Sequence, residues 1–310
     1  MKIRTLLWAV LALAGATALP VRADEATTIA LRYDSELRRI GFPSPLLTVK
    51  IAGREARFLV DSGAGVHTFA AWYVKAAALQ AVHNAGVRAV DAGGRPIDVL
   101  VVRNAQLTLT DGTTLTLAEG AVAEFPPIFE QLRIAGLVSP QLLATQSQAA
   151  ALDLTIPELR LEPMEPAVDR LKATIQGADG LTGVCSNKSS PLSNRLYLIR
   201  TLIDGIATSL TIDTGATSTS ISDGIPAAQA LRSRPGTGRD QMGLGGTRVR
   251  VFQSVPVLVD FGGGPRRLSV AIGPNADGCG SQGLLGMDAL AGCRWVFGNA
   301  AFAMSCVKAP

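Results

Sequence analysis

The pattern Asp-Ser/Thr-Gly-Ala occurs twice in this chain, at residues 61–64 and 213–216. Each copy follows a run of apolar or β-branched residues, 58–60 or 210–212. One such tetrapeptide is a common turn. Two copies in the same setting, half a chain apart, indicate two halves that each supply one carboxylate to a shared site. A pair of close carboxylates can divide acid and base roles without a metal ion.

The sequence around the two motifs repeats as well. Each motif follows an expected hairpin, with strands over 46–51 and 55–60 in the first half and over 196–203 and 206–212 in the second. The turn glycines Gly53 and Gly205 each lie eight residues before their aspartate (61 − 53 = 8 and 213 − 205 = 8). Later apolar-Gly segments contain Gly136 and Gly283, at similar separations of 136 − 61 = 75 and 283 − 213 = 70. The spacing predicts two homologous halves.

We therefore divide the chain into a leader, two lobes and a connector. The expected lobes span 24–162 and 193–310, and each ends in a strand-like segment, 151–162 or 294–305. The connector, 163–192, is rich in Pro and Gly and is expected to hold one short helix over 167–175. Aromatic residues are few, at 5%, and Val, Leu, Thr and Gly are abundant, which favours a β-rich protein with many tight turns.

Residues 1–23 have the features of a signal peptide. Lys2 and Arg4 precede an apolar stretch, and Val21-x-Ala23 matches a cleavage site, so cleavage is expected after Ala23. An uncleaved anchor is the alternative, although the apolar stretch is short of the ~20 residues that span a bilayer. The signal predicts an exported protein, periplasmic or secreted, with no membrane association after cleavage.

Removal of this segment leaves an almost neutral chain. It takes away three basic residues, so 29 − 3 = 26 Lys and Arg face 25 Asp and Glu. The remaining basic residues are scattered, and the composition therefore does not support nucleic-acid binding.

All four cysteines lie in the second half, at 185, 279, 293 and 306. In an exported protein they are expected to form two disulfides, and three pairings are open. A short Cys279–Cys293 loop with Cys185–Cys306 is the pairing we favour from sequence. A zinc site is the competing interpretation; it is disfavoured because no Cys-x-x-Cys occurs and His67 and His83 lie far away in sequence. No metal or cofactor is predicted.

The chemistry is expected at Asp61 and Asp213. A strand that runs into Asp-Ser/Thr-Gly places the carboxyl group at a sharp turn, where glycine allows close approach of the other half. The supporting residues would be Ser62, Gly63, Ala64, Thr214, Gly215 and Ala216. If the two loops meet at a pseudo-twofold axis, the aspartates share a proton and titrate as a pair. Such a pair can activate a water that attacks an amide carbonyl.

At this point the chain resembles the aspartic proteases. The two motifs and the two apolar-Gly segments, 134–137 and 283–286, carry the resemblance, which covers nearly all of the chain from residue 46 onward. Alanine at the fourth motif position is similar to the retroviral, retropepsin-like branch, whereas a single chain with two lobes is similar to the pepsins. The resemblance implies an all-β acid-protease fold of two closed-barrel-like lobes, with a cleft between them that glycine-rich hairpins cover.

The candidate hairpin tips, or flaps, contain Gly93 and Gly94 in the first half and Gly245 and Gly246 in the second. The alternative is that each pair lies in an ordinary glycine turn. Neither tip contains the aromatic residue that pepsins carry in their first flap. Ser139 stands where the second half has Gly286, and His67 stands where it has Thr219; we expect His67 to be a surface or supporting residue.

The leading hypothesis is an exported, monomeric aspartic endopeptidase with internal pseudo-twofold symmetry, acting on peptide or protein substrates. The main alternative is a catalytically silent peptide-binding or scaffold protein with the same fold. A structural module that self-associates through an open sheet edge is a third, and no specific feature supports it.

Overall fold

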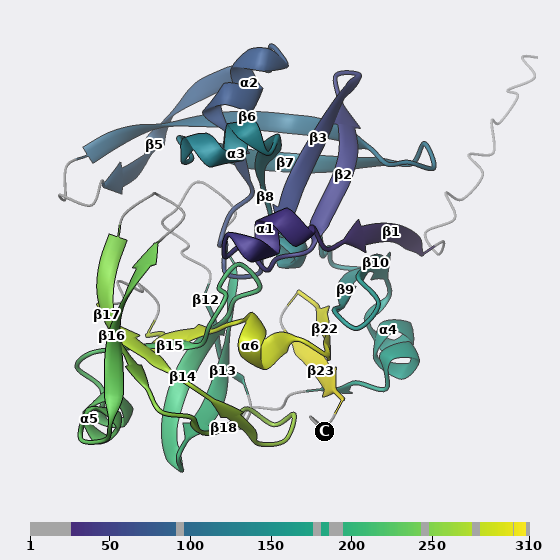
Figure 1. Cartoon of the computed structure of the whole chain (residues 1–310). Helices are drawn as coiled ribbons and strands as arrows, with labels where there is room; N and C mark the ends of the chain where they lie inside the picture. Colours follow the sequence, from purple (N-terminus) through teal and green to yellow (C-terminus); the bar gives the residue numbers. More distant parts are fainter. Residues whose placement is uncertain are drawn as a thin grey trace, which may run out of the picture.

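The structure, a computed structural model, describes residues 26–90, 96–175, 181–185, 195–242, 248–274, 280–299 and 301–307. Strands dominate these residues, and the helices are short: α1 (Ser35–Arg39), α2 (Ala71–Ala76), α3 (Pro127–Gln131), α4 (Met164–Leu171), α5 (Pro226–Arg232), α6 (Met287–Leu290) and the 3-10 turn η1 (Pro140–Leu142). The predicted all-β fold of two homologous lobes is confirmed (Figure 1).

The first lobe is a closed barrel of six strands. Its members, in the order in which they pair, are β2 (Leu46–Ile51), β3 (Arg54–Val60), β8 (Ile134–Val138), β4 (Thr68–Ala70), β7 (Thr114–Ala123) and β6 (Pro96–Thr108). Pairing of Lys50 with Thr108 joins β6 back to β2 and closes the ring. Strand β5 (Ala81–Val90) extends the edge beyond β6. The two strands of the hairpin predicted from the sequence are therefore the start of this barrel.

The second lobe repeats these pairings with a break in one strand. Its strands, in the order in which they pair, are β16 (Gly236–Met242), β17 (Arg248–Ser254), β20 (Ala271–Gly273), β15 (Ser220–Ser222), β21 (Gly283–Leu285), β14 (Ile206–Ile212), β13 (Leu196–Ile203), β18 (Val257–Asp260) and β19 (Arg266–Leu268). Leu202 pairs with Asp260. These two residues lie 152 positions after Lys50 and Thr108, the pair that closes the first barrel. The counterpart of β6 is thus split into β17 and β18. Pro256 lies at the split, and proline has no N–H to donate to a ladder.

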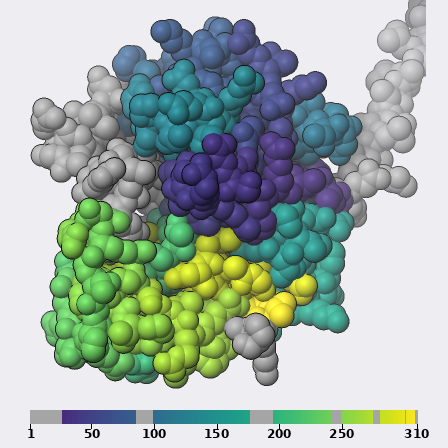
Figure 2. Space-filling view, viewed as in Figure 1, coloured from purple at the N-terminus to yellow at the C-terminus, as the bar shows by residue number. Residues whose placement is uncertain are grey.

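A third, antiparallel sheet joins the two lobes. It contains β1 (Thr27–Arg32), β10 (Glu158–Glu162), β9 (Ala149–Asp153), β22 (Cys293–Phe297), β23 (Phe302–Cys306) and β11 (Thr174–Ile175). Strand β9 of the first half pairs with β22 of the second, with Trp295 opposite Leu152. Trp295 is fully buried. In Figure 2 the teal and yellow residues of this region lie side by side below the purple residues that begin the first lobe. The strand-like segments that end the two halves therefore hold them together.

Some expectations about local structure are wrong. The connector helix is α4, Met164–Leu171, rather than 167–175, and residues 174–175 are the strand β11 instead. The connector also contributes β12 (Leu181–Cys185), which pairs with β13. Lys172 ends α4 in a left-handed conformation (φ 49°), which stops the helix before the expected end.

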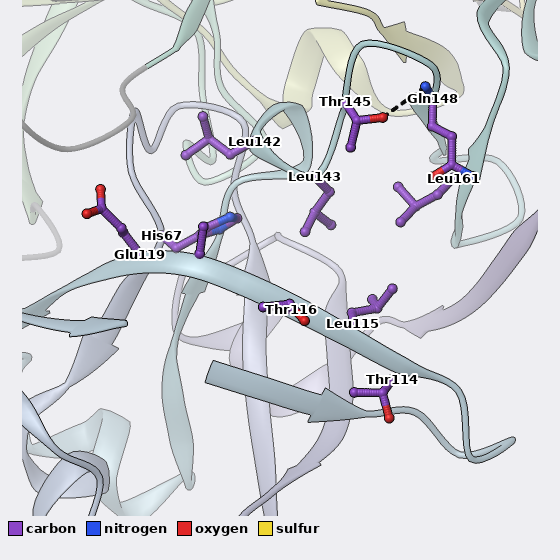
Figure 3. A pocket seen from close by; sticks show the side chains of 11 residues that line it. His67, Thr114, Leu115, Thr116, Glu119, Leu142, Leu143, Thr145, Gln148 and Leu161 are labelled. Carbon is purple, nitrogen blue, oxygen red and sulfur yellow. Dashed lines mark hydrogen bonds between the residues drawn. The ribbon is translucent and has the colours of Figure 1, made fainter. Parts of the chain in front are cut away.

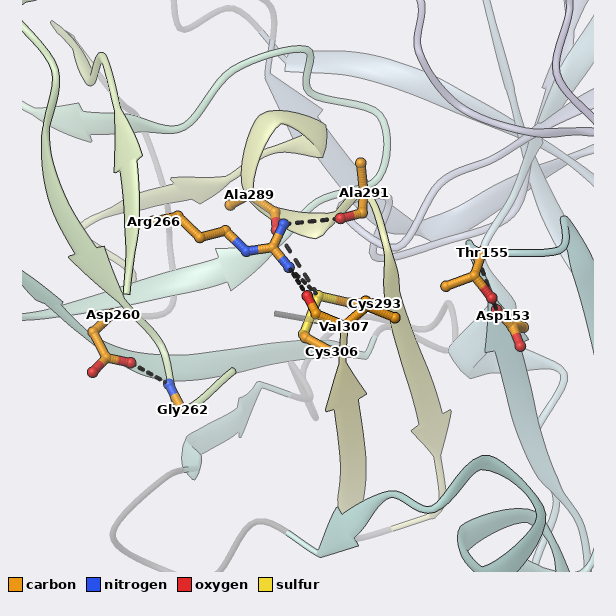
Figure 4. The surroundings of a disulfide bond; sticks show 10 residues. All are labelled: Asp153, Thr155, Asp260, Gly262, Arg266, Ala289, Ala291, Cys293, Cys306 and Val307. Atoms are coloured by element: carbon orange, nitrogen blue, oxygen red, sulfur yellow. Dashed lines mark hydrogen bonds between the residues drawn. A yellow bond between two sulfur atoms is a disulfide. The ribbon is translucent and has the colours of Figure 1, made fainter. Parts of the chain in front are cut away.

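The favoured disulfide pairing is also wrong. Cys293 bonds to Cys306, 13 residues later, because they lie directly opposite each other in the β22–β23 pair, with Cα atoms 4.0 Å apart (Figure 4). Neither the Cys279–Cys293 nor the Cys185–Cys306 bond can then form. Cys279 lies outside the described residues.

Across the described part of the chain, no helix has the length and apolar character needed to cross a bilayer. The leader, 1–23, lies outside the described residues, so its predicted role stays a prediction.

Candidate active site

Asp61 and Asp213 occupy equivalent places, each directly after the strand that leads into its motif. Strand β3 ends at Val60 and β14 ends at Ile212. The Asp61 N–H donates to Val138 O of β8 (2.9 Å), and the Asp213 N–H donates to Leu285 O of β21 (3.0 Å). These two backbone hydrogen bonds, at the ends of β3 and β14, therefore fix the positions of the residues that carry the carboxylates.

Two hydroxyl groups bind the loops to each other across the lobe junction. The Ser62 N–H donates to Thr214 Oγ1 (3.0 Å), and the Thr214 N–H donates to Ser62 Oγ (3.1 Å). The Ser62 hydroxyl donates in turn to Ile212 O and the Thr214 hydroxyl to Val60 O, both at 2.8 Å. All of these groups are buried. These reciprocal hydrogen bonds join the two motifs into one unit.

The carboxylates meet at the centre of this unit. Gly63 and Ala64 donate their N–H groups to Asp61 Oδ1 at 2.8 and 3.2 Å. In the second loop, the N–H groups of residues 215 and 216 donate to Asp213 Oδ1 at 2.7 and 3.0 Å. A Cβ atom on Gly63 would overlap the Asp213 carboxyl group, and one on Gly215 would lie 2.6 Å from Asp61 Oδ2. The glycines thus let each carboxylate approach the opposite loop.

The environment of the pair favours a shared proton. Asp61 and Asp213 are 3% and 9% exposed. Burial raises the pKa of Asp61 above its ordinary value, although hydrogen bonds from Asp213 and backbone N–H groups oppose the rise. Burial also raises the pKa of Asp213, to well above its ordinary value. The charge and the hydrogen bond of Asp61 add to this rise. Both pKa values are raised, so the two carboxyl groups favour holding one proton as a pair.

A crossing of the chain behind each loop explains the two distant glycines. Gly136 and Gly283 have φ values of 155° and 156°. A Cβ on either one would overlap the backbone carbonyl of Thr68 or Ser220, residues that are 152 positions apart. Only glycine fits such a contact, so the apolar-Gly segments support both motifs in the same way.

The two loops differ where Ser139 replaces Gly286. Ser139 donates its hydroxyl to Ala64 O and its N–H to His67 Nδ1 (3.1 Å). In the second loop the Gly286 N–H donates to Thr219 Oγ1 (3.3 Å). His67 therefore accepts the same backbone N–H in the first loop that Thr219 accepts in the second. It is a buried supporting residue, 4% exposed, rather than a surface residue. Burial lowers its pKa from 6.5 to about 4.

Three further residues, not singled out from the sequence, connect the loops to their surroundings. The Gln141 amide donates to Ser62 O (3.0 Å), Ala64 O (3.1 Å) and Arg195 O (2.9 Å). Ser44 of the first lobe donates to Thr214 O (2.9 Å). Asp288 of the second lobe accepts hydrogen bonds from the N–H and the hydroxyl of Thr219. When Gly136 is aligned with Gly283, Gln141 and Asp288 occupy equivalent positions, so that alignment could have revealed both residues. Ser44 has no counterpart signal in the sequence.

The candidate flap residues Gly93, Gly94, Gly245 and Gly246 lie outside the described residues. The strands on either side of each pair do form hairpins. Val90 pairs with Pro96, and Met242 pairs with Arg248. The described residues contain no cluster of three or more His, Cys, Asp or Glu side chains able to hold a metal ion.

No protein-family model matches the chain, and no curated protein sequence matches it. Three solved structures are similar in fold: basic 7S globulin from soybean (12% identity, TM-score 0.48), edgp (11%, 0.49) and conglutin gamma, a basic 7S globulin from lupine seeds (11%, 0.47). Each match covers 91% of this chain and 94–95% of the other. At this identity the likeness concerns the fold alone.

Proposed function

We propose that the protein is an aspartic endopeptidase in which Asp61 and Asp213 activate a water molecule against a peptide bond. The observation that carries the proposal is the reciprocal contact of the two loops, which holds together two buried carboxyl groups with raised pKa values. Structural need alone does not explain two buried aspartates at this junction, because burial of an ionised carboxylate is costly.

The geometry supports a direct hydrolysis. Ionised Asp61 takes a proton from the water as the water oxygen attacks the carbonyl carbon. In this mechanism Asp213 holds the shared proton, donates a hydrogen bond to the carbonyl oxygen and stabilises the tetrahedral intermediate. Return of a proton to the amide nitrogen breaks the C–N bond and releases the amine. No covalent acyl-enzyme forms.

The mechanism requires the pair to carry one proton, so we expect a bell-shaped dependence of kcat/KM on pH. Activity should rise as Asp61 ionises and fall as Asp213 loses its proton, with both limits set by the pair. Because both pKa values are raised, the optimum should lie above that of an ordinary solvated carboxyl pair.

The decisive experiment compares Asp61→Asn and Asp213→Asn with the wild type on a library of denatured proteins or peptides between acidic and neutral pH. We expect each variant to lose at least about 10³-fold in kcat/KM. Asp223→Asn, at an exposed residue paired with Arg232, is the matched control and should keep full activity. Cleavage that survives either substitution at the pair would refute the mechanism.

The second candidate is the silent peptide-binding or scaffold protein. The three similar structures are named as globulins and edgp rather than as hydrolases, which fits this candidate better than an active protease. It predicts that the wild type binds a statine-type peptide, a mimic of the tetrahedral intermediate, without cleaving any peptide. For either candidate we also propose export to a periplasmic or extracellular space, a monomeric state, and lobe boundaries at 162 and 193.

A further inference from the structure

A groove of about 340 Å³ lies in the first lobe (Figure 3), and its lining does not include Asp61 or Asp213. Its walls come from strand β7, from the segment that follows η1, and from β10. It is lined by His67, Thr114, Leu115, Thr116, Ala118, Glu119, Leu142, Leu143, Thr145, Gln148 and Leu161. Its volume lies in the ~300–1,000 Å³ range of small-molecule sites.

The inner end of the groove presents an unused hydrogen-bond donor. His67 Nδ1 accepts from the Ser139 N–H, so the proton of the neutral ring lies on Nε2. Within the described part of the chain, Nε2 has no hydrogen-bond partner, although the residue is 4% exposed. In Figure 3 the nitrogen-bearing edge of the ring points toward Leu143, into the groove. A ring N–H that faces a groove without a protein partner can donate its hydrogen bond to an acceptor bound there.

The other lining residues determine what kind of acceptor fits. Leu143 and Leu161 are buried apolar walls, and Leu115 is half-buried. The lining includes the acidic residue Glu119, paired with Arg103 at 3.6 Å, and no lysine or arginine. The low pKa of His67 keeps its ring uncharged near neutral pH. A carboxylate ligand would therefore lose solvation without gaining a cationic partner in the lining. A neutral carbonyl group does not need such a partner.

We propose that this groove binds a small uncharged carbonyl compound, such as an aliphatic amide, with its carbonyl oxygen on His67 Nε2 and its branched alkyl group against Leu143 and Leu161. The site is connected to the first aspartate loop by two hydrogen bonds, from Ser139 to His67 and from Ser139 to Ala64 O. Occupation of Nε2 strengthens Nδ1 as an acceptor and so stabilises that loop.

The test measures binding directly and does not depend on proteolysis. Isovaleramide is titrated into the full chain while the ring nitrogen signals of His67 are followed by NMR. We expect a saturable shift of Nε2 for the amide, and isovalerate, the matched anion, should bind at least tenfold more weakly. Absence of a saturable shift would overturn the site, and equal binding of isovalerate would overturn the neutral-ligand assignment.

Two variants locate the ligand. His67→Thr keeps an acceptor for the Ser139 N–H, as Thr219 does in the second loop, and should weaken amide binding about 2- to 10-fold through loss of one hydrogen bond. Ala118→Phe fills the mouth of the groove from an exposed position on β7 and should abolish binding without touching His67. His83→Thr, at an exposed histidine on β5, is the control and should bind as the wild type does. Unchanged binding by Ala118→Phe would refute the proposal even if His67→Thr failed to fold.

Discussion

Acid should destabilise this protein through His67, and the size of the effect follows from its burial. The folded-state pKa of about 4 lies below the ordinary 6.5 because the buried ring cannot be charged without loss of solvation. A lowered pKa means that the unfolded chain takes up the proton first, so stability falls as pH drops below about 6.5. At pH 4 the loss amounts to about 3 kcal/mol, at about 1.36 kcal/mol per pKa unit.

The contribution of His67 can be isolated by comparison with His67→Thr. Both aspartates of the pair have raised pKa values, which act in the opposite direction, but they are present in both proteins and cancel in the difference. Between pH 7 and pH 4 the wild type should lose about 3 kcal/mol more than the variant in free energy of unfolding. A loss of that size is a large part of the ~5–15 kcal/mol typical of whole domains.

The assay is urea unfolding at pH 7, 6, 5 and 4, followed by tryptophan fluorescence. His83→Thr is the matched control and should follow the wild-type curve, because His83 is exposed. If His67→Thr and the wild type show parallel loss of stability with pH, the neutral buried ring is not the cause and the reasoning fails.

Three further predictions concern the aspartate loops and the lobe junction. Thr214→Val should destabilise the protein by about 1–3 kcal/mol for each of the two buried groups it leaves without a partner, Ser62 N–H and Val60 O; urea unfolding measures this, and a loss below 1 kcal/mol would contradict it. Gly63→Ala should abolish peptide cleavage because its Cβ overlaps the Asp213 carboxyl group, whereas Gly224→Ala, at a glycine with open space around it, should leave cleavage unchanged. Replacing both Cys293 and Cys306 by alanine should cost about 3 kcal/mol, from the 13-residue separation that the bond closes; a reductant should lower the midpoint of thermal unfolding of the wild type toward that of the variant, and equal stability of the oxidised wild type and the variant would exclude the contribution.

The duplication could be predicted because each half repeats the same short-range pattern of strand residues and turn glycines. The hairpins that lead into Asp61 and Asp213 depend on alternating strand residues and turn glycines, which local sequence reveals. The need for glycine at 136 and 283 also leaves a sequence signal, since no side chain fits against the crossing backbone. These patterns were sufficient to predict an all-β chain of two related lobes with one carboxylate in each.

The tertiary structure decided everything that depends on partners distant in sequence. The shared sheet pairs β9 with β22, and the disulfide follows from the register of β22 with β23; neither register can be read from one strand alone. The raised pKa values of the aspartate pair and the neutral ring of His67 likewise follow from burial, which is a property of the packed chain. The sequence by itself determined which groups could act as a pair, and packing determined their charge.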